Sequence, residues 1–324
     1  MGRMHLLSTA TNASTNQVEG FCMVKNVALK SNVKGSDYLD FTLSDSGGEI
    51  NAKLWDYAPE QHGVYSPNML VKVRATVVLW RETEQLKIDR VRPVTDEDGV
   101  DMASFVLCAP YAPESMYEEL FARADAFADD DLRMLTQYLL KEYKERLLIF
   151  PAALKLHHAM RGGLLYHTLT MLRAAEAICA VYKPIYPELC LDLVYAGVIL
   201  HDVAKCCELT VSELGLATAY STSGQLIGHI SIGVALVERA AAELMIDHST
   251  AELVQHMLLS HHGVPEYGSP RAPMFPEADL VSQLDLIDSR LYEMYDALAE
   301  VMPGGFSERQ WALNNIQLYK HGRE

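Results

Sequence analysis

Histidine is concentrated in one part of this 324-residue sequence, together with carboxylates that could share its chemistry. Nine of the twelve histidines lie between His157 and His262. His201 is followed directly by Asp202 after the apolar run 193–200, and the last two histidines of the stretch are adjacent. Ionisable side chains on apolar helix faces are costly to bury unless they are paired or coordinate a metal. Because imidazole and carboxylate ligands together suit Mn, Fe, Co, Ni or Zn, the pattern predicts a divalent metal centre.

The candidate ligands come from separate segments that are each expected to be helical. They are His167, His201, Asp202, His229, His261, His262 and Asp285. Successive residues of a helix point about 100° apart, so both members of the His201-Asp202 pair can reach one centre only at or near a helix end. An aspartate there has two oxygens and can bridge two ions. Any one of these histidines alone is more often a hydrogen-bonded core or surface residue, but the set at this spacing favours metal binding.

The spacing of apolar side chains predicts the elements that position these residues. After residue 113 apolar residues recur at helical spacing. Helices are expected over 115–128, 131–149, 164–182, 188–205, 225–245, 249–261, 276–300 and 307–319. We therefore interpret 113–324 as an all-α domain that follows an acidic, proline-punctuated linker over 95–112.

The segment 17–94 alternates apolar and polar residues with a period of two, which is typical of half-buried strands. Five strands are expected, over about 18–30, 38–43, 50–55, 69–80 and 84–94, with a short helix near 57–62. Five strands with a helix between the third and the fourth are the plan of an OB-fold. The predicted fold class is a small N-terminal OB-fold β-barrel followed by an all-α domain, and residues 1–16 are expected to be a flexible terminus.

The same alternation predicts which side chains leave the barrel core. Those expected to share one outer face are Tyr38, Lys53, Trp55, Lys72, Arg74 and Lys87. Aromatic rings stack on bases while Lys and Arg follow the phosphates, so this face is predicted to bind a single nucleic-acid strand. The alternative is that Tyr38 and Trp55 cover a barrel end or a domain interface.

Charge is distributed unevenly along the chain. The formal net charge is −16, but residues 1–94 are near +1 and the remainder is near −17. No apolar run approaches the roughly 20 residues that span a bilayer, and the start does not read as a signal peptide. The six scattered cysteines form no CxxC pair and favour free thiols in a reducing compartment. We expect a cytoplasmic protein with no membrane partner, either a monomer or a homo-oligomer.

The order of the candidate ligands resembles a known signature. His167, His201-Asp202, His229, His261-His262 and Asp285 follow the H…HD…H…HH…D pattern of two-metal HD phosphohydrolases. Lys205 matches the lysine of their HDxxK variant. The flanking residues 162–169, 224–230, 259–263 and 268–270 are similar to those of YhaM-type 3′→5′ exoribonucleases, which also place an OB-fold before the HD domain. The resemblance covers about 17–320.

The resemblance implies a ligand set and roles for its neighbours. One ion would be held by His167, His201, Asp202 and Asp285, and the second by Asp202, His229, His261 and His262, with manganese favoured. Asp202 and Lys205 would be catalytic, the first as the bridge and the second by neutralising charge on phosphoryl oxygens. Arg161, Arg271 and Arg290 are candidate phosphate contacts, and Asp288 is expected beside the ligands or the phosphate. His157 and His158, about ten residues before His167, are expected to be structural, and the alternative is that they line the entrance or contact substrate.

The activity that the resemblance implies is metal-dependent 3′-5′ hydrolysis of single-stranded RNA, with single-stranded DNA as a further candidate. One alternative is an HD phosphohydrolase acting on mononucleotides or cyclic nucleotides. A strand-binding barrel argues against it, and 263–270 lacks the GYP motif of relatives that cleave cyclic dinucleotides. The other alternative is a nucleic-acid-binding protein with an HD scaffold, which the intact ligand set argues against.

Overall fold

The computed structural model describes residues 16–33, 35–45, 48–81, 83–100, 105–265 and 268–323. The expected flexible terminus therefore lies, except for Asn16, outside the described residues, as does part of the expected linker. The chain divides into two compact units. The first, called the barrel unit, is Met1–Cys108 with Ser212–Leu216. The second, called the helical unit, is Ala109–Val211 with Ala217–Glu324.

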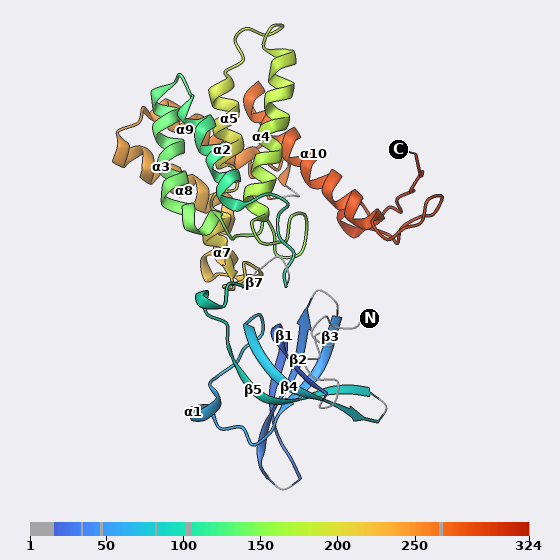
Figure 1. The fold of residues 1–324 in the computed structure, drawn as a ribbon. Coiled ribbons are helices and arrows are strands. Elements are labelled where there is room, and N and C mark those ends of the chain that lie inside the picture. The colour runs from blue at the N-terminus through green and yellow to red at the C-terminus, as the bar shows by residue number, and fades with distance from the viewer. Residues whose placement is uncertain are drawn as a thin grey trace. The chain divides into compact units, whose positions relative to one another are not determined.

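The barrel unit contains a closed five-stranded β-barrel (Figure 1). Its elements are β1 (Gln17–Ser31), β2 (Asp37–Asp45), β3 (Gly48–Leu54), α1 (Pro59–His62), β4 (Leu70–Trp80), β5 (Thr83–Pro93) and the short helix η2 (Asp96–Asp98). The strands are ordered β1-β2-β3-β5-β4, and α1 lies in sequence between the third and fourth strands. This is the OB-fold topology that the sequence predicts.

Alternation of side chains builds the barrel core. In β2 and β3 every second residue is buried, such as Leu39, Phe41 and Leu43, which face the interior, and Ser44 of β2 is buried as well. Leu39 pairs with Leu54 across the two strands, so the apolar faces of both strands coincide. The pairing of β4 with β5 shifts register after Arg74, where β5 carries one extra residue, Asp89, and such a bulge bends its strand.

The helical unit is built from helices that surround one apolar core (Figure 1). Its elements are α2 (Pro113–Asp125), α3 (Asp130–Leu147), α4 (Gly163–Tyr182), α5 (Leu191–Leu200), α6 (Lys205–Glu208), β6 (Leu209–Val211), β7 (Ala217–Tyr220), α7 (Thr222–Leu226), α8 (Gly228–Leu244), α9 (His248–Ser260), α10 (Pro276–Leu298) and η5 (Trp311–Leu313). In α5 every residue from Leu193 to Leu200 is buried, which explains its continuous apolar sequence. By length and hydropathy α4 could cross a membrane, but half of it is buried in the unit, as in an ordinary core helix.

Two features of the helical unit differ from the prediction. The segment 307–319 is not a helix: it folds back on itself through bridges between Phe306 and Tyr319 and between Gln310 and Ile316. Asn314 and Asn315 both take positive φ angles, 56° and 59°, which Asn tolerates and a helix cannot continue through. The small ribbon of β6 and β7 was also not predicted, because its strands are too short to show a period.

Candidate metal centre and nucleic-acid surfaces

All seven candidate ligands meet inside the helical unit. His167 lies in α4, His201 and Asp202 follow the last residue of α5, and His229 lies in the first turn of α8. His261 and His262 follow α9 directly, and Asp285 lies in α10. Helix ends thus supply the adjacent pairs, where the chain leaves the helix and neighbouring side chains can converge.

The ligand atoms gather on the two sides of the Asp202 carboxylate. Near Oδ2 lie the Nε2 atoms of His201 at 3.3 Å and His167 at 3.8 Å, and Asp285 Oδ1 is 3.3 Å from His167 Nε2. Near Oδ1 lie the Nε2 atoms of His229 at 3.5 Å and His261 at 3.8 Å. The side chains of His229, His261 and His262 in turn form a compact group whose ligand atoms lie within 4.8 Å of one another.

The cluster is suited to divalent cations. Asp202 Oδ1, His229 Nε2 and His261 Nε2 are buried and have no hydrogen-bond partner among the described residues. Leaving such atoms unsatisfied costs about 1–3 kcal/mol each. Nitrogen and oxygen ligands bind a cation at about 2.0–2.2 Å, which places neighbouring ligand atoms roughly 3–3.5 Å apart. The observed separations are close to this range, so the donor set fits a divalent metal site.

Four of the histidines are oriented through Nδ1, so that Nε2 faces the cluster. The Nδ1 atoms of His201 and His261 lie 2.8 Å from the carbonyl oxygens of Val198 and Leu258, three residues earlier on each helix. A carbonyl can only accept, so Nδ1–H donates and the neutral ring keeps its lone pair on Nε2. The last carbonyls of a helix have no partner within the helix, so a histidine that follows the helix can bind one.

Carboxylates hold the other two rings in the same way. His167 Nδ1 lies 2.7 Å from Asp288 Oδ2, and His229 Nδ1 lies 3.0 Å from Glu208 Oε1. Asp288 Oδ2 also accepts a 2.7 Å hydrogen bond from His158 Nε2. Outer carboxylates of this kind fix the tautomer and the orientation of metal-ligating histidines. The supporting roles of Glu208 and His158 were not predicted.

Burial and neighbouring charges together set the protonation of the cluster. Burial, reinforced by neighbouring histidines, holds the pKa of His261 well below its ordinary value, and burial also lowers the pKa of His262. Burial opposes the charge on Asp202, but Lys205 and the histidines outweigh it and keep the pKa of this carboxyl low. Burial likewise acts to lower the pKa of His167, but Asp285 and Asp288 raise that pKa to about 9. These two carboxylates therefore attract positive charge to the cluster.

Lys205 is placed against the Asp202 carboxylate. Its Nζ lies 2.6 Å from Asp202 Oδ2, and the side chain is 9% exposed. Burial acts against its charge, but Asp202 raises the pKa of the ammonium above its ordinary value. Lys205 is therefore a buried cation beside the ligands, one turn after Asp202 as its spacing in the sequence suggests.

An open cavity of about 440 Å³ adjoins the ligands. Its lining includes His261, His262 and Asp285 together with Arg290 and His157. The structure thus places the candidate phosphate contact Arg290 at the cluster. In the described part of the chain, the other two candidates, Arg161 and Arg271, do not line this cavity.

The barrel unit carries an aromatic patch, which we define as Tyr38, Lys53, Trp55, Trp80 and Lys87. The rings of Tyr38 and Trp55 lie with their centroids 4.6 Å apart, and Lys53 Nζ is 5.5 and 5.6 Å from these centroids. Trp80 and Lys87 line a cavity of about 240 Å³ together with Lys53 and Trp55. Trp80 is 60% exposed and was missed, because the end of a long hairpin gives no signal of its own.

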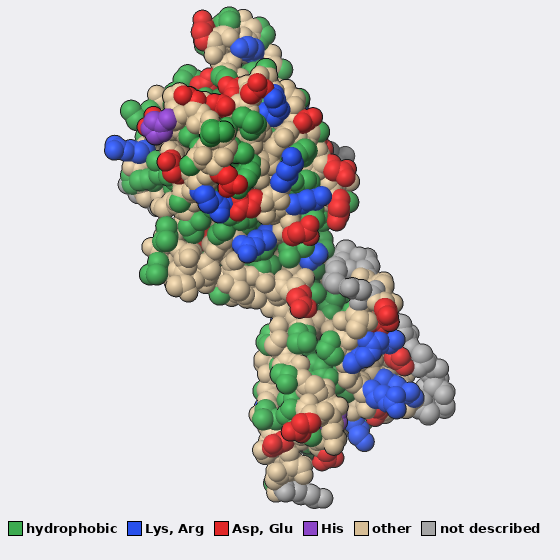
Figure 2. Space-filling view, turned by 90° about the vertical axis from the view of Figure 1, so that its left-hand side faces the viewer, with side chains coloured by type: hydrophobic (Ala, Val, Ile, Leu, Met, Phe, Trp, Pro, Cys, Tyr) green, Lys and Arg blue, Asp and Glu red, His purple; other side chains and the backbone are tan. Residues whose placement is uncertain are grey.

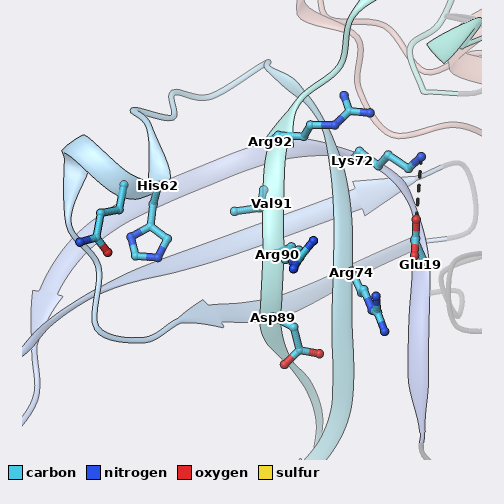
Figure 3. A pocket seen from close by; sticks show the side chains of 9 residues that line it. Glu19, His62, Lys72, Arg74, Asp89, Arg90, Val91 and Arg92 are labelled. Carbon is cyan, nitrogen blue, oxygen red and sulfur yellow. Dashed lines mark ion pairs between the residues drawn. The ribbon is translucent and has the colours of Figure 1, made fainter. Parts of the chain in front are cut away.

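A separate basic groove is formed by Lys72 and Arg74 of β4 with Arg90 and Arg92 of β5 (Figure 3). These residues line a cavity of about 500 Å³. Lys72 pairs directly with Arg92 across the strands and Arg74 with Arg90, although like charges in such positions destabilise a sheet. In the described structure Arg74 and Arg90 make no ion pair, so their charge is open to an anionic ligand. Lys and Arg side chains also stand together on the barrel surface in Figure 2.

The prediction of one shared outer face is therefore wrong. Tyr38, Lys53, Trp55 and Lys87 belong to the aromatic patch, whereas Lys72 and Arg74 belong to the basic groove. All six point away from the core, but outward side chains of a closed barrel point in different directions around it.

Comparisons with known proteins find two family models, similar curated proteins and a solved structure. Residues 164–290 match the family described as HD domain, and residues 103–183 match one described as putative helicase. The chain is 38% identical to 3′-5′ exoribonuclease YhaM of Geobacillus sp. over 94% of this chain and 92% of that protein. It is 37% identical to the Bacillus subtilis protein of the same name over 94% of this chain and 95% of that protein. A solved OB-fold domain of replication protein A from Methanococcus maripaludis is 15% identical, with a TM-score of 0.21 over 25% of this chain and 86% of that one.

Proposed function

The chain belongs to the YhaM family of 3′-5′ exoribonucleases, and from this premise we propose that it hydrolyses single-stranded RNA from the 3′ end at two divalent cations held by the helical unit. The single observation that carries the two-cation proposal is the placement of Asp202. Its two carboxylate oxygens face different groups of histidines, and Oδ1 has no other partner among the described residues.

The two groups define two sets of ligands. We assign His167, His201, Asp202 and Asp285 to one cation, and Asp202, His229, His261 and His262 to the other. Mixed imidazole and carboxylate ligands are compatible with Mn, Fe, Co, Ni and Zn, and we favour Mn. When bound, such cations lower the pKa of water and stabilise charge on a phosphoryl group during in-line attack.

The residues of the chain supply position and charge. Asp288 and Glu208 hold the rings of His167 and His229, so their Nε2 atoms are fixed before a ligand arrives. Lys205 offsets the negative charge of Asp202 and, in this proposal, the charge that develops on the phosphoryl oxygens. Arg290 lines the adjoining cavity and makes no ion pair with a described residue, which suits a contact to a phosphate.

The barrel unit is proposed to hold the strand. The aromatic patch offers rings on which bases of any sequence can stack, and the basic groove offers cations for the phosphates. Stacking and charge act equally on RNA and DNA, so single-stranded DNA is a second substrate in this proposal. All six cysteines are free, which supports a reducing, cytoplasmic compartment.

Metal stoichiometry tests the assignment directly. Metal-free protein is dialysed against Mn²⁺, and the bound metal is counted for wild type, Asp202→Ala and the control Asp279→Ala. Asp279 is an exposed acidic residue in the first turn of α10. We expect two ions per chain in wild type and in Asp279→Ala, and fewer than one in Asp202→Ala because both sites lose a ligand. Two ions per chain in Asp202→Ala would rule out the bridging role.

A further inference from the structure

The cavity beside the ligands has a chemically mixed lining. It includes the ligands His261, His262 and Asp285. It also includes four large apolar side chains, Leu156, Val264, Leu286 and Trp311. All four are exposed, Trp311 the most at 75%. Exposed apolar side chains gathered beside a polar site mark a surface that binds a ligand.

Trp311 is presented to the cavity on a fixed turn. The backbone N–H of Gln310 donates to Ile316 at 2.8 Å, and Arg309 Nη1 donates to the carbonyl of Asn315 at 2.9 Å. Leu313, two residues after Trp311, is 1% exposed and anchors the turn in the helical unit. The backbone is thus ordered while the indole ring remains exposed, so little conformational entropy is lost when a flat ligand stacks on it.

The cavity matches the size and chemistry of one nucleotide. Its volume of about 440 Å³ is within the roughly 300–1,000 Å³ of small-molecule sites. The cation ligands and Arg290 suit a phosphate, and the apolar side chains of the lining suit a base. The indole face accepts any base, because every base has a π-face and stacking needs no specific hydrogen bonds.

We infer that Trp311 stacks on the base of the 3′-terminal nucleotide and so positions that nucleotide beside the metal centre. This inference rests on the proposed function, since it assigns the nucleotide to the substrate of that site. Trp311 is then a positioning residue that increases affinity for the end of the strand without selecting its sequence.

A binding cycle tests the inference without requiring turnover. The affinities of Mn²⁺-loaded protein for adenosine 5′-monophosphate and for ribose 5-phosphate are measured by calorimetry. The ratio of the two affinities isolates the contribution of the base. In wild type we expect this ratio to be about tenfold or more, as for a base stacked on an aromatic side chain. In Trp311→Ala we expect it to fall to near one, and in Trp311→Phe to be largely restored.

The matched control is Tyr295→Ala, which removes an equally exposed aromatic side chain of α10 that does not line the cavity. It should keep the wild-type ratio. A full ratio in Trp311→Ala, or no preference for the base in wild type, would overturn the inference. Failure of the proposed function would appear differently, as intact RNA in a digestion assay while the binding ratios still follow Trp311.

Discussion

Replacing Asp288 by Asn should weaken metal binding although Asp288 is not assigned as a ligand. Its Oδ2 accepts hydrogen bonds of 2.7 Å from both His158 and His167. Burial acts to raise the pKa of Asp288, but these two bonds hold it well below its usual range, so the group is a carboxylate at neutral pH. Asn keeps one oxygen that can accept both bonds but loses the charge, and charge-assisted hydrogen bonds are roughly twice as strong as neutral ones.

The expected loss can be bounded. Removing an outer partner of a metal ligand typically costs about 10–100-fold in metal affinity, or about 1.4–2.7 kcal/mol. We expect a loss in this range for Asp288→Asn when Mn²⁺ is titrated into metal-free protein in competition with a chelating dye. Asp296→Asn makes the same chemical change at an exposed position of the same helix and should bind as wild type does. If Asp288→Asn also bound Mn²⁺ with wild-type affinity, the reasoning about ring orientation would be refuted.

Three further predictions concern the strand, the fold and the metal. The double variant Arg74→Ala, Arg90→Ala should reduce by about 1.4 the slope of log affinity for single-stranded RNA against log salt concentration. Trp55→Ala should weaken binding by about 1–3 kcal/mol and leave that slope unchanged. Equal slopes in all proteins would exclude the basic groove as a phosphate contact. Gly163→Ala should lower thermal stability more than Gly197→Ala. The new Cβ at position 163 would lie 2.0 Å from a backbone carbonyl oxygen, whereas the new Cβ at position 197 would meet the flexible end of a methionine side chain at 2.1 Å. The reverse order of stability in thermal unfolding would contradict the packing described. Supplying Mn²⁺ to metal-free protein at 100 times the Kd should stabilise it by about 2.7 kcal/mol for each occupied site, measured by denaturant unfolding. No stabilisation would show that the cluster does not bind the ion in the folded state.

The candidate metal ligands that meet in the helical unit could be located from the sequence because of their positions relative to helix ends. His201-Asp202 and His261-His262 each follow an apolar helix, and this position explains both their adjacency and their hydrogen bonds to helix carbonyls. The partners that orient the rings are different. His158 and Asp288 are 130 residues apart, and no local pattern connects them before the helices are packed.

The barrel shows the same division between local and non-local information. Period-two alternation predicts the strands and which residues face outward, because both depend only on neighbouring residues. It could not predict that Arg74 and Trp55 lie on different parts of the surface, since that depends on barrel closure and on the register shift after Arg74. The exposed position of Trp311 could not be predicted for a related reason. Apolar residues near the C-terminus recur at helical spacing, whereas the chain there forms a turn at two consecutive asparagines with positive φ angles.

Digestion of a 5′-labelled single-stranded RNA with added Mn²⁺ tests the central claim most directly. We predict that wild-type protein shortens the RNA progressively from its 3′ end, and that EDTA or Asp202→Ala abolishes the shortening, with folding of the variant confirmed by circular dichroism. RNA that stays intact with metal-loaded wild-type protein would contradict the claim, as would wild-type turnover in Asp202→Ala.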